Sequence, residues 1–105
     1  MVVAAVRGGP ILNDATMEDA QMVGLDKVVR VIDTGCNFVG VVREKSSDFF
    51  LQVLDAADMV IAKGQGNYET LDDIGDRGFF ILKAKCDHVA RALGVNNGDL
   101  VLAQG

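Results

Sequence analysis

Five short runs of apolar residues recur along the chain and have the length of β-strands. Their middles are apolar or β-branched and do not alternate cleanly with polar residues, which is typical of strands buried on both faces of a parallel sheet. These predicted strands comprise residues 2–7, 28–33, 58–63, 79–85 and 100–103.

Helix signals separate the predicted strands. Thr16 is an N-cap candidate, with Asp19 as a weak substitute for the usual Glu of a capping box and Gly24 as the stop. Ser47 can cap a second helix, a short third helix begins near Asn67 and ends by Gly75, and a fourth ends at Gly94. Apolar residues at helical spacing form one face of the second helix (Phe50, Val53, Leu54, Ala57) and of the fourth (Cys86, Val89, Ala90, Leu93).

The alternation of strands and helices predicts the α/β class. It favours right-handed crossovers and a mostly parallel sheet of about five strands, in a Rossmann-like three-layer α/β/α arrangement. With 105 residues, the chain is expected to form one domain, residues 1–105, with a thin margin for its core.

Composition and charge narrow the range of functions. The net charge is −5 and no cluster of Lys or Arg occurs, which argues against a nucleic-acid partner. No apolar run has membrane-spanning length and no leader pattern is present, so we expect a cytoplasmic chain without a membrane partner. Cys36 and Cys86 lack metal-type spacing and are expected to be free thiols. His88 lies off the apolar face of its helix and is expected to be exposed rather than to act as a ligand or base.

Polar residues and glycines gather where the predicted strands end. In a parallel α/β sheet, ligands bind outside the carboxyl ends of the strands. The segments at these ends are Arg7-Gly8-Gly9, Asp33-Thr34-Gly35, Lys63-Gly64-Gln65-Gly66-Asn67 and Lys85-Cys86-Asp87. This asymmetry is expected of a site for a phosphorylated small molecule.

The segment that begins at Lys63 suits a phosphate group. Gly64 and Gly66 let backbone N–H groups approach an anion at the start of a helix, and Lys63 adds a positive charge. The segment is neither a Walker A loop nor a complete GxGxxG motif, because Glu69 stands at the third glycine position. A tight strand-to-helix turn with a solvated lysine accounts for the same residues equally well.

Two aspartates have competing interpretations. Asp14 is a candidate ligand for a hard divalent ion, although a capping or first-turn role is the commoner use of such a residue. Asp33-Thr34-Gly35 resembles the triplet of the aspartic proteases, in which a homodimer supplies one carboxylate per subunit. Those proteases are all-β proteins, and the helical spacing on both sides of this triplet disfavours that interpretation.

Four segments taken together are more specific than any one alone. They look like consecutive blocks of the damage-control phosphatase family, in its prokaryotic and archaeal branch, and the resemblance runs over essentially the whole chain. The segments are RGGPILNDAT (residues 7–16), VIDTG (31–35), IAKGQGNYE (61–69) and KAKC (83–86).

The resemblance implies a metal-dependent phosphatase that hydrolyses phosphorylated metabolites, with manganese, nickel, cobalt or magnesium as the ion. By similarity, Asp14 would be a metal ligand with Asn13 beside it, and Asp14 and Lys63 would be the catalytic residues. The phosphorylated substrate would lie against Arg7, Asn13, Asp33, Lys63, Gly64, Gly66, Asn67 and Lys85.

One departure from the family pattern qualifies this expectation. Family members are much longer, and their metal site also uses an upstream Asp-Asn pair that occurs nowhere in these 105 residues. The chain therefore resembles the C-terminal part of the enzyme, an incomplete domain that needs a missing N-terminal segment or subunit, or that forms a homo-oligomer. Little or no phosphatase activity is expected of the chain alone. A non-catalytic phosphate- or nucleotide-binding module is the alternative, with the homodimeric aspartic protease as a disfavoured third possibility.

Overall fold

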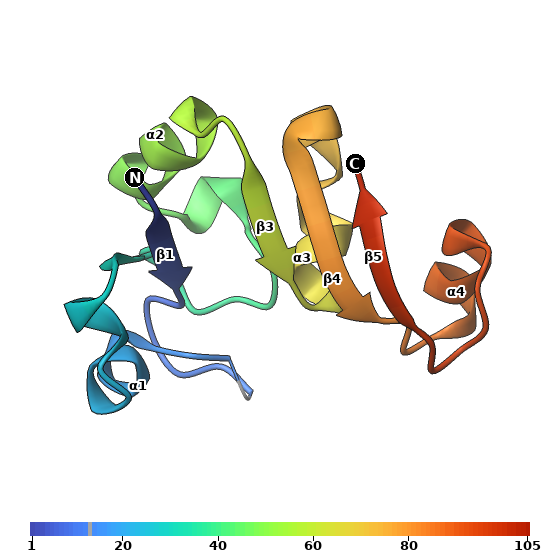
Figure 1. Cartoon of the computed structure of the whole chain (residues 1–105), viewed down its shortest axis with the longest axis horizontal. Helices are drawn as coiled ribbons and strands as arrows, with labels where there is room; N and C mark the ends of the chain where they lie inside the picture. The colour runs from blue at the N-terminus through green and yellow to red at the C-terminus, as the bar shows by residue number, and fades with distance from the viewer. Residues whose placement is uncertain (13) are drawn as a thin grey trace. The chain divides into compact units, whose positions relative to one another are not determined.

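The computed structural model describes residues 1–12 and 14–105, and the chain divides into two compact units, Met1–Ala56 and Ala57–Gly105 (Figure 1). We call these the first and the second unit. The strands are β1 (Val3–Val6), β2 (Arg30–Asp33), β3 (Val60–Lys63), β4 (Gly78–Lys83) and β5 (Leu100–Gln104). The α-helices are α1 (Met17–Met22), α2 (Asp48–Ala56), α3 (Gln65–Thr70) and α4 (Asp87–Leu93), and the 3₁₀ segments are η1 (Leu25–Lys27), η2 (Arg43–Lys45) and η3 (Asp72–Arg77).

The first unit contains the parallel pair β1 and β2. Their register runs from Val3 opposite Arg30 to Val6 opposite Asp33. One further bridge joins Arg7 to Thr16, so the chain beyond β1 returns alongside the strand end. The apolar core residues in this unit are Val6, Ala20, Ile32, Cys36, Val41, Phe50 and Leu54.

Side-chain caps start both α-helices of the first unit, as the sequence predicts. The Asp19 carboxylate accepts a hydrogen bond from the backbone N–H of Thr16 at 2.9 Å, and the Thr16 hydroxyl accepts one from the N–H of Asp19 at 3.4 Å. Asp19 thus completes a capping box that usually carries Glu. At α2, the Ser47 hydroxyl accepts a hydrogen bond from the N–H of Phe50 at 3.1 Å.

The second unit contains a three-stranded sheet with the order β3-β4-β5. β3 and β4 are parallel, whereas β4 and β5 are antiparallel. Helix α3 packs against β3 and β4, and η3 packs against β4 and β5. Tyr68 on α3 meets Phe80 on β4 edge to face, with ring centroids 5.4 Å apart, and Phe80 is the most deeply buried large side chain of the described residues.

The structure confirms the α/β class and the position of all five predicted strands. The described residues form two small sheets, and β5 runs antiparallel to its neighbour. The direction and the partner of a strand could not be predicted, because an apolar run has the same pattern in either direction.

The helices needed small corrections. Helix α3 begins at Gln65 and ends at Thr70, and a separate segment, η3, continues to Arg77. Cys86 is the N-cap residue of α4 rather than a member of its apolar face. Within the described residues, no helix combines the length and the apolarity needed to cross a membrane.

Candidate functional site

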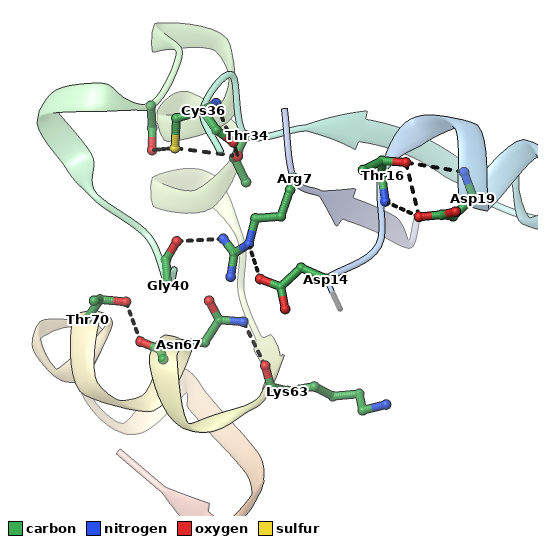
Figure 2. A network of polar contacts seen from close by, with 12 residues as sticks. Arg7, Asp14, Thr16, Asp19, Thr34, Cys36, Gly40, Lys63, Asn67 and Thr70 are labelled. Atoms are coloured by element: carbon green, nitrogen blue, oxygen red, sulfur yellow. Dashed lines mark hydrogen bonds and ion pairs between the residues drawn. The ribbon is translucent and has the colours of Figure 1, made fainter. Parts of the chain in front are cut away.

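Arg7 organises the polar residues that follow β1. Its guanidinium is almost buried, and its Nε donates to Oδ2 of Asp14 at 2.8 Å (Figure 2). Its Nη1 donates to the backbone carbonyl of Gly40 at 2.6 Å. The Arg7 side chain therefore ties two loops of the first unit to the carboxyl end of β1.

Asp14 is neither the cap of α1 nor a first-turn acid. It precedes the true N-cap, Thr16, by two residues, and the acids of the first turn are Glu18 and Asp19. The side chain of Asp14 is 40% exposed, and Arg7 engages one of its two carboxylate oxygens. The carboxylate thus remains accessible from solvent, as a ligand-binding residue requires.

The residues after β2 form a tight turn. The Oδ1 atom of Asp33 accepts a hydrogen bond from the N–H of Gly35 at 2.8 Å. Gly35 has a φ of +78°, and a Cβ atom there would lie 2.7 Å from Cβ of Ser47, so only glycine fits. Asp33 lies in an α/β unit with a parallel strand pair, which is unlike the all-β aspartic proteases.

Cys36 follows this turn and is a buried free thiol. Its Sγ lies 3.7 Å from the hydroxyl oxygens of both Thr34 and Ser46. Burial raises the pKa of Cys36, but the N–H of Phe38, the Ser46 and Thr34 hydroxyls and the charge of Arg7 together lower that pKa below its ordinary value of 9.0.

Lys63 ends β3 in the second unit and begins the predicted phosphate loop. Gly64 adopts a φ of +96°, which favours glycine, and α3 starts at the next residue. The side-chain amide of Asn67 donates to the carbonyl of Lys63 at 2.8 Å, so Asn67 holds the loop in shape (Figure 2). The Lys63 ammonium is on an exposed side chain.

Gln65 joins this loop to the loop after β4, which sequence reasoning missed. Its Oε1 accepts from the backbone N–H of Lys85 at 2.9 Å, and its Nε2 donates to Oε1 of Glu69 at 3.0 Å. The same Nε2 lies 3.8 Å from Sγ of Cys86. A glutamine between two glycines gives no sequence signal for such a bridge, because Lys85 and Cys86 lie about 20 residues farther along the chain.

The predicted site residues therefore fall into two sets. Arg7, Asp14 and Asp33 belong to the first unit, whereas Lys63, Gly64, Gly66, Asn67 and Lys85 gather around the strand ends of the second. Asn13 lies outside the described residues.

A hollow of about 450 Å³ lies elsewhere in the second unit, and none of the predicted residues lines it. Its walls consist of Tyr68, Glu69, His88, Val89 and Ala92. His88 is exposed there, as the sequence predicts.

The described residues of this chain do not by themselves fit a divalent metal ion. Among the side chains that the structure describes, no group of three or more His, Cys, Asp or Glu residues could hold one. Asp14 is also already paired with the Arg7 cation. A hard divalent ion needs several oxygen ligands, so a single, partly neutralised carboxylate is insufficient.

Comparison with known proteins places this chain in a family. The damage-control phosphatase ARMT1-like domain matches residues 1–101. The chain is 52% identical over 101 residues to a damage-control phosphatase of Pyrococcus horikoshii. The aligned region covers 95% of this chain and 35% of that protein. It is 42% identical over 100 residues to a damage-control phosphatase of Archaeoglobus fulgidus, covering 93% of this chain and 35% of the relative. An uncharacterized protein of Methanocaldococcus jannaschii is 48% identical over 105 residues, covering 96% of this chain and 34% of the relative.

A solved structure agrees with these matches. The crystal structure of a DUF89 family protein from Pyrococcus horikoshii superposes with a TM-score of 0.91 at 50% identity, covering 97% of this chain and 36% of that one. The chain thus spans about a third of the length of the relatives it matches. The protein belongs to the damage-control phosphatase family, through its ARMT1-like domain.

Proposed function

We propose that this chain supplies part of the active site of a divalent-metal-dependent phosphatase that hydrolyses phosphorylated small metabolites. The observation that carries the proposal is the family match over residues 1–101. Two curated relatives that share 42% and 52% of the aligned residues are named damage-control phosphatases. The polar residues at the strand ends give this assignment a chemical basis in the chain itself.

Lys63 is the proposed phosphate-binding residue. Its ammonium is exposed at the carboxyl end of β3, and Gly64 and Asn67 fix the loop that carries it. A compact positive charge there can neutralise phosphoryl oxygens in the ground state and, more strongly, in the transition state. Gly66, in the first turn of α3, and Lys85, whose backbone N–H donates to Gln65, complete the substrate side of the second unit.

Asp14 is the proposed contribution of this chain to metal binding, with manganese, nickel, cobalt or magnesium as the candidate ions. Because one carboxylate does not suffice, we propose that the remaining ligands, including an Asp-Asn pair, come from polypeptide other than these 105 residues. In such an assembly, the strands of this chain would form part of a Rossmann-like three-layer α/β/α arrangement. The proposed location of the assembly is the cytoplasm.

A second candidate is a non-catalytic phosphate- or nucleotide-binding module. It is favoured by the contrast between the ordered Lys63 loop and the lack of a metal-binding cluster in the described part of the chain. Under this alternative, Lys63 would bind the anion and Asp14 would have only a structural role beside Arg7.

The purified chain tests both candidates. We expect no hydrolysis of a generic phosphate ester with any of the four metals or with a chelator, but we expect inorganic phosphate to shift the amide resonances of residues 63–67. The Lys63→Ala variant should lose these shifts, whereas Lys83→Ala, on the next strand, should keep them. Metal-dependent turnover that disappears in Asp14→Ala would show that the chain completes the metal site alone. Shifts that survive in Lys63→Ala would remove Lys63 from the substrate side.

A further inference from the structure

Gln65 lies where the pairing of β3 with β4 ends. The register closes at Lys63 opposite Ile81, and the N–H of Gly64 still donates to the carbonyl of Ile81 at 2.9 Å. At the next residue, Gln65, the chain leaves the direction of the strand and begins α3. The segment after β4 therefore continues beyond the last residue of β3 that pairs with it.

The segment after β4 is held from two sides. Toward β5, the N–H of Ala84 donates to the carbonyl of Asp99 at 2.9 Å, and the carbonyl of Ala84 accepts from the N–H of Gly98 at 2.6 Å. The N–H of the next residue, Lys85, donates instead to Oε1 of Gln65 at 2.9 Å. A side-chain carboxamide carries the same kinds of donor and acceptor as a peptide group, so Gln65 takes the place of a strand neighbour here.

Glu69 fixes the orientation of the Gln65 carboxamide. Nε2 of Gln65 donates to Oε1 of Glu69, one turn farther along α3, at 3.0 Å, and the same Nε2 lies 3.8 Å from Sγ of Cys86. A carboxylate can only accept a hydrogen bond and a backbone N–H can only donate one, so a single orientation of the carboxamide satisfies both partners. Gln65 is half-buried, which strengthens these hydrogen bonds relative to bonds made in water.

We propose that Gln65 is a positioning residue that holds residues 85–87 against residues 63–67, so that the two segments bind one phosphate group together. The inference rests on the proposed function, which places both segments on the substrate side. Lys63 and Lys85 both have exposed side chains, and they follow neighbouring parallel strands. Two lysines on separate segments bind the same anion tightly only if the segments are held in place beforehand, and the Gln65 bridge supplies that preorganisation.

The first experiment titrates the 105-residue chain with inorganic phosphate and follows the amide resonances of both segments. In the unmodified chain, we expect residues 63–67 and 85–87 to shift with one dissociation constant, because one anion contacts both. Gln65→Met keeps an unbranched side chain but removes both hydrogen bonds. It should weaken phosphate binding about threefold to tenfold, the range expected for the loss of a hydrogen bond, and should abolish the shifts of residues 85–87. Gln52→Met, at an exposed position of α2 in the first unit, is the matched control and should bind like the unmodified chain.

A reciprocal exchange distinguishes positioning from a general loss of stability. Gln65→Glu keeps an acceptor for Lys85 but sets two carboxylates against each other, so it should weaken binding. Glu69→Gln alone should not weaken binding, because its carbonyl oxygen still accepts from Gln65. The double variant restores a donor beside the carboxylate and the net charge of −5. It should bind phosphate at least about threefold more tightly than the product of the two single effects predicts, and it should regain the shifts of residues 85–87.

Three results would overturn the inference and leave the proposed function standing. They are shifts confined to residues 63–67 in the unmodified chain, full binding with shifts of both segments in Gln65→Met, and a double variant whose effect equals the product of the single effects. If Gln65→Met does not fold, as its circular dichroism spectrum would show, the exchange decides alone, since its variants keep hydrogen-bonding groups at both positions. Phosphate that shifts neither segment of the unmodified chain would overturn the inference and the proposed substrate side together.

Discussion

Replacing Arg7 with Met tests the organisation of the first unit. Methionine keeps much of the length and the apolar contacts of the side chain but removes the donors to Asp14 Oδ2 and to the Gly40 carbonyl. Arg7 is only 9% exposed, and Gly40 is buried. The substitution therefore leaves a buried acceptor without this donor and a carboxylate without its counter-charge.

The two losses differ in size. Hydrogen bonds to charged groups contribute about 1.5–3 kcal/mol each, and an unsatisfied buried acceptor costs about 1–3 kcal/mol. Asp14 is 40% exposed and can regain water, so its share must be discounted. We expect Arg7→Met to lower the free energy of unfolding of the first unit by about 2–4 kcal/mol. The free energy of unfolding of Arg7→Lys should lie between those of the unmodified chain and Arg7→Met, because an ammonium group cannot reproduce the planar set of guanidinium donors.

Hydrogen exchange of the β1 and β2 amides measures this free energy locally, which matters because the chain has two compact units. Asp55→Asn is the matched control, because it breaks only a 3.5 Å ion pair with Arg43 between partly exposed side chains. The free energy of unfolding of this control should fall by no more than about 1 kcal/mol. An Arg7→Met variant that loses no more than the control would refute the role assigned to Arg7.

Three further predictions concern the caps, the core and the thiol. Thr16→Ala should lower the free energy of unfolding by about 1 kcal/mol, because it removes the N-cap of α1. Unchanged hydrogen-exchange protection of α1 would contradict this. Phe80→Ala should lower the free energy of unfolding by about 3–5 kcal/mol, because Phe80 is buried against Tyr68. Urea unfolding followed by the fluorescence of Tyr68, the only tyrosine, measures this change. A loss under about 2 kcal/mol would count against the packing described. The lowered pKa of Cys36 means that its thiolate stabilises the fold above pH 9.0 and that this contribution is lost as the pH falls through the lowered value. In a Cys86→Ser variant, alkylation of Cys36 should therefore have its midpoint at a lower pH in the folded chain than in urea, and equal midpoints would exclude the effect.

Local signals predicted the elements well. The caps at Thr16 and Ser47 and the end of α4 at Gly94 lie where the sequence places them, because capping depends on residues within one turn. The five strands also occur at their predicted positions, since apolar runs between turn residues are a local pattern.

Features that depend on residues far apart in the sequence could not be predicted from it. The antiparallel pairing of β5 and the bridge from Gln65 to Lys85 depend on partners far away in the sequence. The exposure of Ile61 and Leu102 was also not predicted, because continuous apolar runs indicate strands that are buried on both faces. The pairing of Arg7 with Asp14 has no helical or strand spacing that could have revealed it.

The central claim is that this chain supplies Asp14 and Lys63 to a metal-dependent phosphatase site that other polypeptide completes. The most direct measurement is hydrolysis of a generic phosphate ester by this chain mixed with the unmatched part of the Pyrococcus horikoshii relative, with and without manganese. The account predicts turnover in the mixture only, abolished by a chelator, by Asp14→Asn and by Lys63→Ala, and retained in Asp26→Asn. A mixture that binds but stays inactive with manganese, nickel, cobalt and magnesium, or one that is indifferent to Asp14→Asn and Lys63→Ala, would contradict it.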